Sequence, residues 1–309
     1  MTTNLISIVS PVFNEQEVIQ DFLKETQENL KKDSYEIILI DDGSTDNTPD
    51  ILKAIVVQNP KIKAIRFTRN FGQQAAIMAG LRMANGKAII VMDSDLQDPP
   101  QYIPQLIKKW EEGYKIVYAK RLKRRDSFLK KFTASIFYKL LHFLTDTKMP
   151  KNTGDFYLLD RKVVNELKQL PEKFLYFRGL TGWLGFKQSE IEIIRPKRMK
   201  GTTGYTLKKM MRLATDSLLS FSNKPLRAIT YLGMIVLMTG IVLGLALLFK
   251  ASLFKEQTLS PILLVTIIIL SGLNLISLGI ISEYLSRIFF QTQDRPLYVI
   301  EETYGFKKE

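Results

Sequence analysis

Short runs of apolar residues alternate with segments of helical periodicity over the first part of the chain. Strands are predicted over residues 6–10, 35–40, 62–67 and 88–92, and helices over residues 18–30, 48–57 and 73–84. The Ile/Val-rich runs EIILID and AIIVMD lack the alternation of apolar and polar residues that is typical of a strand with one solvent-exposed face. They therefore suit strands covered by helices on both faces. This order predicts a doubly wound α/β domain with a mostly parallel sheet.

The pattern changes after Arg121, where the strand rhythm stops. Residues 128–143 have an apolar face, which predicts an amphipathic helix lying in a membrane interface. An ordinary surface helix with its apolar stripe turned to the core is the alternative. The basic residues just before this segment favour the membrane interpretation.

Two later segments carry no charge at all. Residues 228–249 and 259–281 are free of Asp, Glu, Lys and Arg over 22 and 23 residues, long enough to cross a bilayer. Basic residues flank the pair, whereas the link between them carries Lys250, Lys255 and Glu256. The positive-inside rule therefore predicts a multi-pass plasma-membrane protein with both termini in the cytoplasm.

The net charge of +13 is confined to two runs. Residues 120–131 hold seven basic residues and one acidic, and residues 195–212 hold seven basic and none acidic. Each run leads into an apolar helical segment, which favours an anionic lipid partner over a nucleic acid. A solvated helix face is the bland alternative.

Composition limits the available chemistry. The chain has no cysteine and one histidine, His142, which excludes thiol nucleophiles and zinc–thiolate sites and makes a Ser-His-Asp triad hard to assemble. Carboxylates are left as the expected catalytic groups.

The most acidic motif, MDSDLQDPP, follows the strand predicted over residues 88–92. Asp93, Asp95 and Gln97 occupy alternate positions, and an extended segment would direct them to one side. Clustered oxygen ligands suit Mg²⁺ or Mn²⁺, and such ions usually bridge a substrate diphosphate. Because ligands of open α/β sheets bind beyond the carboxyl ends of strands, chemistry is expected here.

A second acidic turn, IDDGSTDNT, ends another strand. Asp41 and Asp42 stand at its tip, Gly43 serves the turn, and a residue from Asp46 to Thr48 can cap the next helix. The two adjacent carboxylates are either structural caps or ligands for a nucleotide or a metal. We favour the second interpretation.

Taken together, these motifs resemble those of family-two glycosyltransferases. The resemblance rests on PVFNE at 11–15, DDGSTD at 41–46, RNFGQQAA at 69–76 and DSDLQDPP at 93–100. NTGDFYLLDR at 152–161, SFSNKPLR at 220–227 and the two apolar segments resemble the polyprenyl-phosphate branch, which includes dolichol-phosphate mannose synthases and bactoprenol glucosyltransferases.

The resemblance implies a GT-A fold and inverting transfer of a sugar, with glucose from UDP-glucose the best guess, to undecaprenyl phosphate. It implies a nucleotide-sugar-binding core over 1–122, an acceptor-side region over 123–225, two transmembrane helices over 226–283 and a cytoplasmic tail over 284–309. It assigns nucleotide-sugar contacts to Pro11, Asn14, Glu15, Asp41, Asp42, Asp93 and Ser94, metal binding to Asp93, Asp95 and Gln97, catalysis to Asp95 and Asp155, and lipid-phosphate contacts to Arg121, Ser135 and Arg198.

Two departures from the family pattern fall near the acceptor side. Relatives read Gly-Asp-Phe-Arg where Tyr157 stands, and Gly-x-Ser-Lys-Tyr where this chain has residues 201–205. Asp155 is the candidate base, yet a phosphate monoester is largely dianionic at neutral pH and hardly needs deprotonation. Asp155 is therefore expected to orient the acceptor or to stabilise the arginines instead of abstracting a proton, and a structural role near a helix that starts at Asp160 is the alternative.

Two other functions compete with lipid glycosylation. A processive polysaccharide synthase of the same fold is disfavoured because the chain lacks a Q-x-x-R-W motif. A catalytically inactive membrane scaffold that binds nucleotide sugars or anionic lipid is disfavoured by the intact D-x-D-x-Q motif. A homo-oligomer is left open.

Overall fold

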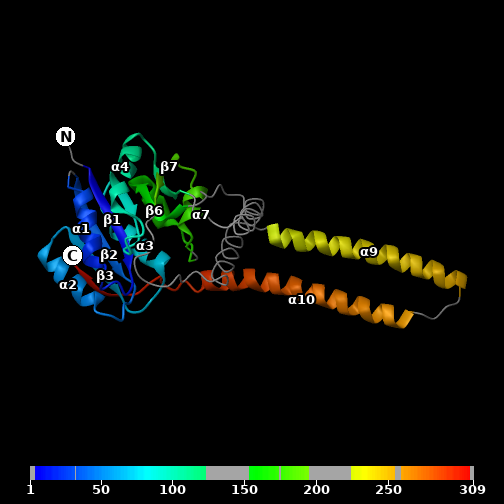
Figure 1. Cartoon of the computed structure of the whole chain (residues 1–309). Coiled ribbons are helices and arrows are strands. Elements are labelled where there is room, and N and C mark those ends of the chain that lie inside the picture. The colour runs from blue at the N-terminus through cyan, green and yellow to red at the C-terminus, as the bar shows by residue number, and fades with distance from the viewer. Residues whose placement is uncertain are drawn as a thin grey trace. The chain divides into compact units, whose positions relative to one another are not determined.

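The computed structural model describes residues 4–31, 33–122, 153–173, 175–194, 224–254 and 259–306 (Figure 1). These residues fall into two compact units. The first holds the described residues up to 194 and those from 295 on, and the second holds the described residues between 224 and 294. The helix predicted over 128–143, together with Ser135 and Arg198, lies outside the described residues.

The first unit begins with the predicted alternation of strands and helices. Its elements are β1 (Leu5–Val12), α1 (Ile19–Asn29), β2 (Ser34–Asp41), α2 (Thr48–Gln58), β3 (Ile62–Phe67), α3 (Gln73–Met83) and β4 (Ala88–Val91). Each lies within a few residues of its predicted range, so the α/β prediction is confirmed for this part.

The rest of the first unit adds four strands that the sequence pattern did not predict. They are β5 (Ile116–Arg121), β6 (Thr153–Asp160), β7 (Gln188–Ile193) and β8 (Ile300–Tyr304). Helices η1 (Pro100–Tyr102) and α4 (Ile103–Glu111) precede β5, and α6 (Arg161–Gln169) and α7 (Phe177–Trp183) lie between β6 and β7. The expectation that the strand rhythm stops after Arg121 is therefore wrong.

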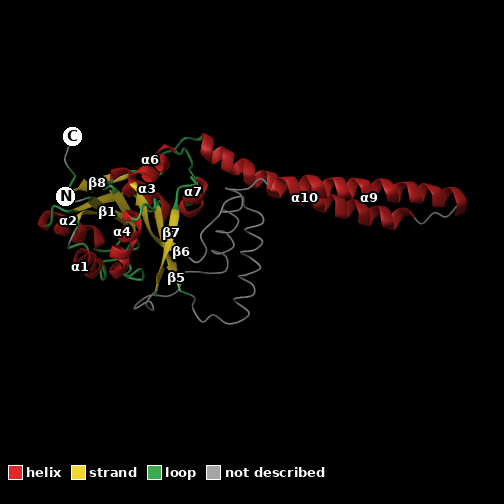
Figure 2. Cartoon of the chain, turned by 90° about the horizontal axis from the view of Figure 1, so that it is seen from above, coloured by secondary structure: helices red, strands yellow, loops and turns green. Residues whose placement is uncertain are grey.

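The strands of the described residues form one eight-stranded sheet in the order β7-β5-β6-β4-β1-β2-β3-β8. Figure 2 shows the strands in yellow. The centre, β4-β1-β2-β3, is parallel, but β6 runs antiparallel to β4 and β5, and β8 runs antiparallel to β3. Strands β5 and β7 are parallel again, so the sheet is mixed, with four parallel and three antiparallel strand pairs. Strand direction outside the parallel centre depends on connections that local periodicity does not report.

Helices cover both faces of the sheet. One face packs against α1, α2 and α4 through Phe22, Leu52 and Leu106, all in the main hydrophobic core. On the other face α3 lies so close that a β-carbon on Gly80 would overlap Val9 and Ile40. Burial on both faces explains why the central strands are almost purely Ile and Val.

The C-terminal strand β8 belongs to the first unit, although the longest helices precede it in sequence. It pairs with the edge of β3, and Tyr298 stacks on Phe67 with ring centroids 4.9 Å apart. Arg66 Nε on β3 lies 3.0 Å from Glu301 Oε2 on β8. Residues predicted to be a tail therefore complete the sheet.

The second unit contains α9 (Lys224–Phe254) and α10 (Leu259–Thr292), 31 and 34 residues long. Among the described residues, one segment, Leu270–Thr292 of α10, is long and apolar enough to cross a membrane. A shorter apolar segment covers Ile229–Val242 of α9.

Candidate active site

The sequence motifs meet at one edge of the sheet. Parallel strands β1, β2 and β4 end there, and because β6 is antiparallel to β4, its first residues reach the same edge. The register pairs Val91, the last residue of β4, with Tyr157, so Asp93 and Asp155 each lie two residues beyond this pair, toward the same edge. The sheet thus brings together carboxylates 62 positions apart in the sequence.

The loops after β1 and β2 are joined by hydrogen bonds. Asn14, at a φ of +55°, donates its backbone N–H to Ser44 Oγ at 2.9 Å and accepts from the backbone N–H of Thr45 at 2.9 Å. The N–H of Glu15 donates to Thr48 Oγ1 at 3.0 Å. The N-cap residue of α2 is Asn47, whose side chain makes no capping hydrogen bond, whereas Asp46, one residue earlier, accepts from the N–H of Thr48 at 3.0 Å.

Asp41 is almost fully buried at the end of β2. Its Oδ1 accepts from the N–H of Ser44 at 2.9 Å, and its Oδ2 lies 3.8 Å from Arg66 Nε. Burial raises the pKa of Asp41 above its usual value, although the Ser44 hydrogen bonds and Arg66 oppose the rise. One oxygen of this carboxylate thus serves the turn.

Asp42, also buried, accepts from two backbone groups of the loop that precedes α3. Its Oδ1 lies 2.7 Å from the N of Phe71 and its Oδ2 lies 2.9 Å from the N of Gly72. Burial raises the pKa of Asp42, and these two hydrogen bonds oppose the rise. Both carboxylate oxygens of Asp42 therefore accept hydrogen bonds from the protein backbone.

The D-x-D segment is a turn, so the expected alternation of Asp93, Asp95 and Gln97 is wrong. Strand β4 ends at Val91, Leu96 has a φ of +56°, and Asp95 Oδ1 accepts from the N–H of Gln97 at 3.0 Å. A left-handed residue reverses the chain locally, which removes the period of two. Asp93 and Asp95 still leave the same strand end.

Two glutamines at the start of α3 contact carboxylates of the site. Gln73 Nε2 donates to Asp93 Oδ1 at 2.7 Å, and Gln74 Nε2 donates to Asp155 Oδ2 at 3.5 Å. Sequence reasoning used RNFGQQAA only as part of the resemblance and assigned these side chains no role.

Asp155 also faces a cation that sequence reasoning missed. Arg178 on α7 lies with Nη2 3.4 Å from Asp155 Oδ1, and its Nη1 donates to the carbonyl of Thr153 at 2.9 Å. Arg178 stands in YFRGL, which carries no catalytic pattern, so only the fold reveals the pair.

Arg121 reaches the site from the end of β5. Its Nη2 lies 3.8 Å from Oδ1 of Asp98, a fully buried residue of the DSDLQDPP motif, and its guanidinium fills the space beside Gly154. The register of β5 and β6 shifts between Tyr118 and Lys120, opposite Gly154 and Asp155. Such irregularities commonly re-aim side chains at functional sites.

Tyr157 lies on β6, two residues after Asp155. The ring is buried beside Tyr118, and its hydroxyl has no hydrogen-bond partner among the described residues. Burial, with the nearby Asp155 and Tyr118, raises the pKa of Tyr157 well above 10.0. The phenol stays neutral at every physiological pH.

Comparison with known proteins agrees with this geometry. Residues 7–168 match the model of glycosyl transferase family 2. A Bacillus subtilis relative described as an uncharacterized glycosyltransferase, YkcC, is 44% identical over 98% of this chain and 95% of its own. The chain belongs to glycosyl transferase family 2. It is a glycosyltransferase.

Other relatives carry more specific descriptions. The Escherichia coli protein described as a prophage bactoprenol glucosyl transferase homolog is 41% identical, covering 96% of this chain and 98% of its own. The bactoprenol glucosyl transferase of Shigella phage SfV is likewise 41% identical, with the same coverage. A glucosyl-3-phosphoglycerate synthase structure from Mycobacterium tuberculosis with Mg²⁺ and UDP has a TM-score of 0.49 and 20% identity, covering 70% of this chain and 79% of that chain.

The acidic edge of this glycosyltransferase suits a hard divalent cation whose coordination shell is completed by a substrate. Within the part of the chain that the structure describes, no group of three or more Asp, Glu, His or Cys side chains is placed to enclose a metal. Mg²⁺ is commonly held by one or two carboxylates, with phosphates and waters completing the shell. Asp93 and Asp95 meet that requirement.

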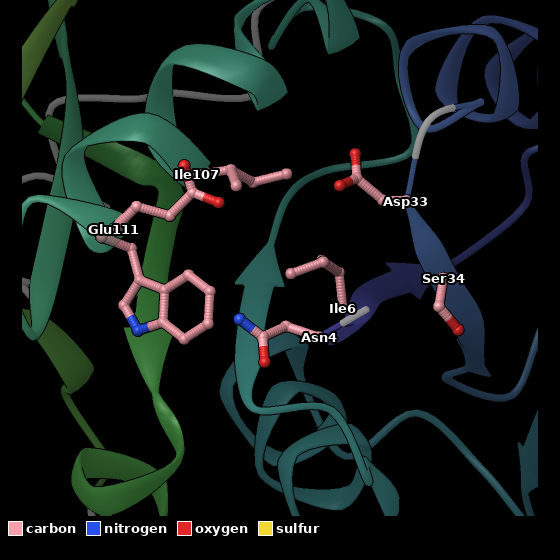
Figure 3. Close-up of a pocket in the computed structure, with 7 residues that line it drawn as sticks. Asn4, Ile6, Asp33, Ser34, Ile107 and Glu111 are labelled. Carbon is pink, nitrogen blue, oxygen red and sulfur yellow. The ribbon is translucent and has the colours of Figure 1, made fainter. Parts of the chain in front are cut away.

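A separate pocket lies at the opposite, amino end of the strands. Asn4 and Ser34, close to the starts of β1 and β2, line it together with Ile107 and Glu111 of α4 (Figure 3). None of the predicted site residues lines it. The carboxyl edge is therefore the candidate site of the glycosyltransferase.

Proposed function

We propose that this glycosyltransferase transfers glucose from UDP-glucose to undecaprenyl phosphate at the cytoplasmic face of the membrane. The observation that carries the proposal is full-length similarity: relatives described as bactoprenol glucosyl transferases align at about 41% identity over 96% of the chain. The alignment therefore includes α9 and α10 as well as the catalytic unit, so it favours a lipid acceptor over a soluble one.

In this proposal Asp93, Asp95 and Gln97 hold Mg²⁺ or Mn²⁺ against the donor diphosphate. When bound, the ion neutralises charge on the leaving UDP. Pro11, Asn14, Glu15, Asp41 and Ser94 form the nucleotide side, because the loops that carry them are tied together at the same edge. Ser94 Oγ donates to the carbonyl of Pro11 at 3.0 Å, which links the D-x-D turn to the first loop.

The proposed reaction is a direct displacement. A phosphate oxygen of the acceptor attacks C1 of glucose, the bond from C1 to the diphosphate oxygen breaks, and UDP leaves with that electron pair, inverting C1. The acceptor phosphate is already ionised at neutral pH, so no general base is required. Asp155, paired with Arg178 at 3.4 Å, then acts by orienting cations and acceptor.

Arg121, together with Arg198, is proposed to bind the acceptor phosphate. Arginine offers two parallel donors to a phosphate, and the contact of Arg121 with Asp98 ties it to the metal-binding motif. Ser135 is retained as a further proposed contact. The chain thus offers positive charge on the acceptor side and negative charge on the metal side.

Two transmembrane helices are proposed, and the sheet supports an even number of crossings. Strand β8 pairs with β3, so residue 300 must lie on the same side of any membrane as the catalytic sheet. If Leu270–Thr292 of α10 crosses, another segment between residues 194 and 300 must cross back. The 31-residue α9 is the apolar helix available for that crossing.

The test is a transfer assay with the purified full-length protein. Undecaprenyl phosphate is incubated with labelled UDP-glucose, UDP-galactose or GDP-mannose, and lipid products are identified by mass spectrometry. A single hexose on the lipid phosphate, from UDP-glucose, is expected. Glycolipid from another donor would correct the sugar, whereas a polysaccharide product, or no lipid product from any donor, would overturn the proposal.

A further inference from the structure

The two glutamines that open α3 point to different halves of the candidate active site. Gln73 donates to Asp93 of the D-x-D turn, whereas its neighbour Gln74 donates to Asp155 on β6. They are the first two residues of one helix, so the position of the start of α3 determines both contacts. A shift of the helix start would disturb both carboxylates together.

The start of α3 is held by Asp42. Its two carboxylate oxygens accept from the N–H groups of Phe71 and Gly72, the two residues before the helix, at 2.7 and 2.9 Å. Hydrogen bonds to a charged partner are stronger than those between neutral groups. Asp42 is buried, so water competes little for these oxygens.

Two glycines make this attachment possible. Gly72 has a φ of +99°, a conformation that side-chain-bearing residues rarely adopt, and it directs the chain from the loop into α3. A β-carbon on Gly43 would lie 2.5 Å from the carbonyl carbon of Arg69, so Gly43 allows the turn that carries Asp42 to contact the loop. The end of β2 is thus connected to the start of α3 by hydrogen bonds from backbone N–H groups to the side chain of Asp42.

We propose that Gln73 and Gln74 are positioning residues, Gln73 for Asp93 on the metal side and Gln74 for Asp155 on the acceptor side. Asp42 sets both by fixing the start of α3, a role in place of the nucleotide contact expected from the sequence. The inference rests on the proposed function only where it assigns Asp155 to the acceptor. Its metal side depends on the D-x-D turn alone.

The test uses Gln73→Leu and Gln74→Leu in the full-length protein. Leucine keeps a comparable side-chain length and a high helix propensity while removing the amide donor. Gln105→Leu, at an exposed position on α4, is the matched control. Thermal unfolding of each variant checks that α3 remains folded.

Two measurements separate the two glutamines. Mn²⁺ binding in the presence of UDP, followed by the electron paramagnetic resonance signal of free Mn²⁺, reports the metal side without turnover. Steady-state kinetics with undecaprenyl phosphate reports the acceptor side. Gln73→Leu is expected to weaken Mn²⁺ binding about 10-fold and leave the acceptor KM unchanged, since it removes a hydrogen bond to a charged group on the metal side only.

Gln74→Leu is expected to do the reverse, raising the acceptor KM several-fold with Mn²⁺ binding unchanged. Asp42→Asn places an amide donor against two backbone donors, so it is expected to impair both parameters. Unchanged Mn²⁺ binding in Gln73→Leu, or identical effects of both glutamine variants on both parameters, would overturn the inference. If the wild type fails to glycosylate the lipid, the proposed function fails, while the Mn²⁺ measurement still decides the role of Gln73.

Discussion

The guanidinium of Arg121 occupies the space into which a side chain on Gly154 would project. A β-carbon on Gly154 would overlap Nη2 of Arg121 and lie 2.9 and 3.2 Å from its Cζ and Nε, closer than van der Waals contact allows. Gly154 therefore allows a phosphate-binding candidate from β5 to lie flat against β6, next to Asp155. The relationship links the two strands next to the point where their register shifts, between Tyr118 and Lys120.

Gly154→Ala should displace Arg121 and weaken use of the lipid phosphate. We expect kcat/KM for undecaprenyl phosphate to fall about 10- to 100-fold, the range that loss of a charged hydrogen-bond donor produces. A double-mutant cycle with Arg121→Ala is the control. The double variant should be no worse than Arg121→Ala alone, and strictly additive losses would show that Gly154 acts elsewhere.

Asp95→Asn should abolish glycolipid formation and leave the protein folded. Asparagine keeps the oxygen that accepts from the N–H of Gln97 at 3.0 Å, so the turn survives, but it lacks the charge that a divalent cation requires. Chelator should abolish wild-type turnover in the same assay, and added Mg²⁺ or Mn²⁺ should restore it. Full wild-type turnover in metal-free buffer would contradict this prediction.

Glu36 on β2 should contribute to stability in a pH-dependent way. This buried carboxylate accepts from Ser7 Oγ at 2.6 Å, from Lys63 Nζ at 2.7 Å and from the N–H of Asn85 at 2.7 Å. Burial raises the pKa of Glu36, but these hydrogen bonds outweigh it, so the pKa lies below its usual 4.5. The ionised form is therefore the one that the fold stabilises.

We expect Glu36→Gln to lower the unfolding free energy by about 2 kcal/mol at pH 7, because a buried donor loses its charged acceptor. The stabilisation is complete above pH 4.5 and is lost as the pH falls through the folded-state pKa, so the two proteins should converge in acid. Thermal unfolding across pH measures this. Glu302→Gln, which breaks an exposed pair with Lys53, should change little.

The end of α9 and the end of α10 should lie on opposite sides of the membrane, with the end of α9 outside the cell. The native chain has no cysteine, so single Cys substitutions can be probed in intact cells with a membrane-impermeant thiol reagent. Phe254→Cys, at the end of α9, should react from outside, and Thr292→Cys, at the end of α10, should not. The reverse labelling would place the catalytic sheet outside, away from cytoplasmic nucleotide sugars.

Much of the first half of the fold could be predicted because its signals are local. The Ile/Val runs of β1, β2 and β4 and the helical spacing of α3 each occupy one short window of sequence. The acidic motifs were found for the same reason, since an Asp-rich turn after a buried strand is visible without knowing the fold. Only the detail of the D-x-D turn, where Leu96 reverses the chain, was missed.

Strand β8 and the direction of β6 could not be predicted in this way. Residues 300–304 form a strand because β3 offers an unpaired edge, and β3 is more than 230 positions earlier in the chain. Edge pairing of this kind depends on what lies beside a segment in space. The sequence YVIEETY shows only weak alternation of apolar and polar positions by itself.

By itself, the sequence determined the α/β class and the two acidic strand ends, because each depends on residues within a few positions of one another. The family-two chemistry was implied by the resemblance of motifs spread along the chain. The tertiary structure decided which side chains meet at the strand ends. It pairs Arg178 with Asp155, and it lets Asp42 accept hydrogen bonds from the backbone before α3. It also packs the guanidinium of Arg121 against Gly154. These contacts join strands, helices and loops that are far apart in the chain, and only the packed fold sets the distances between such segments.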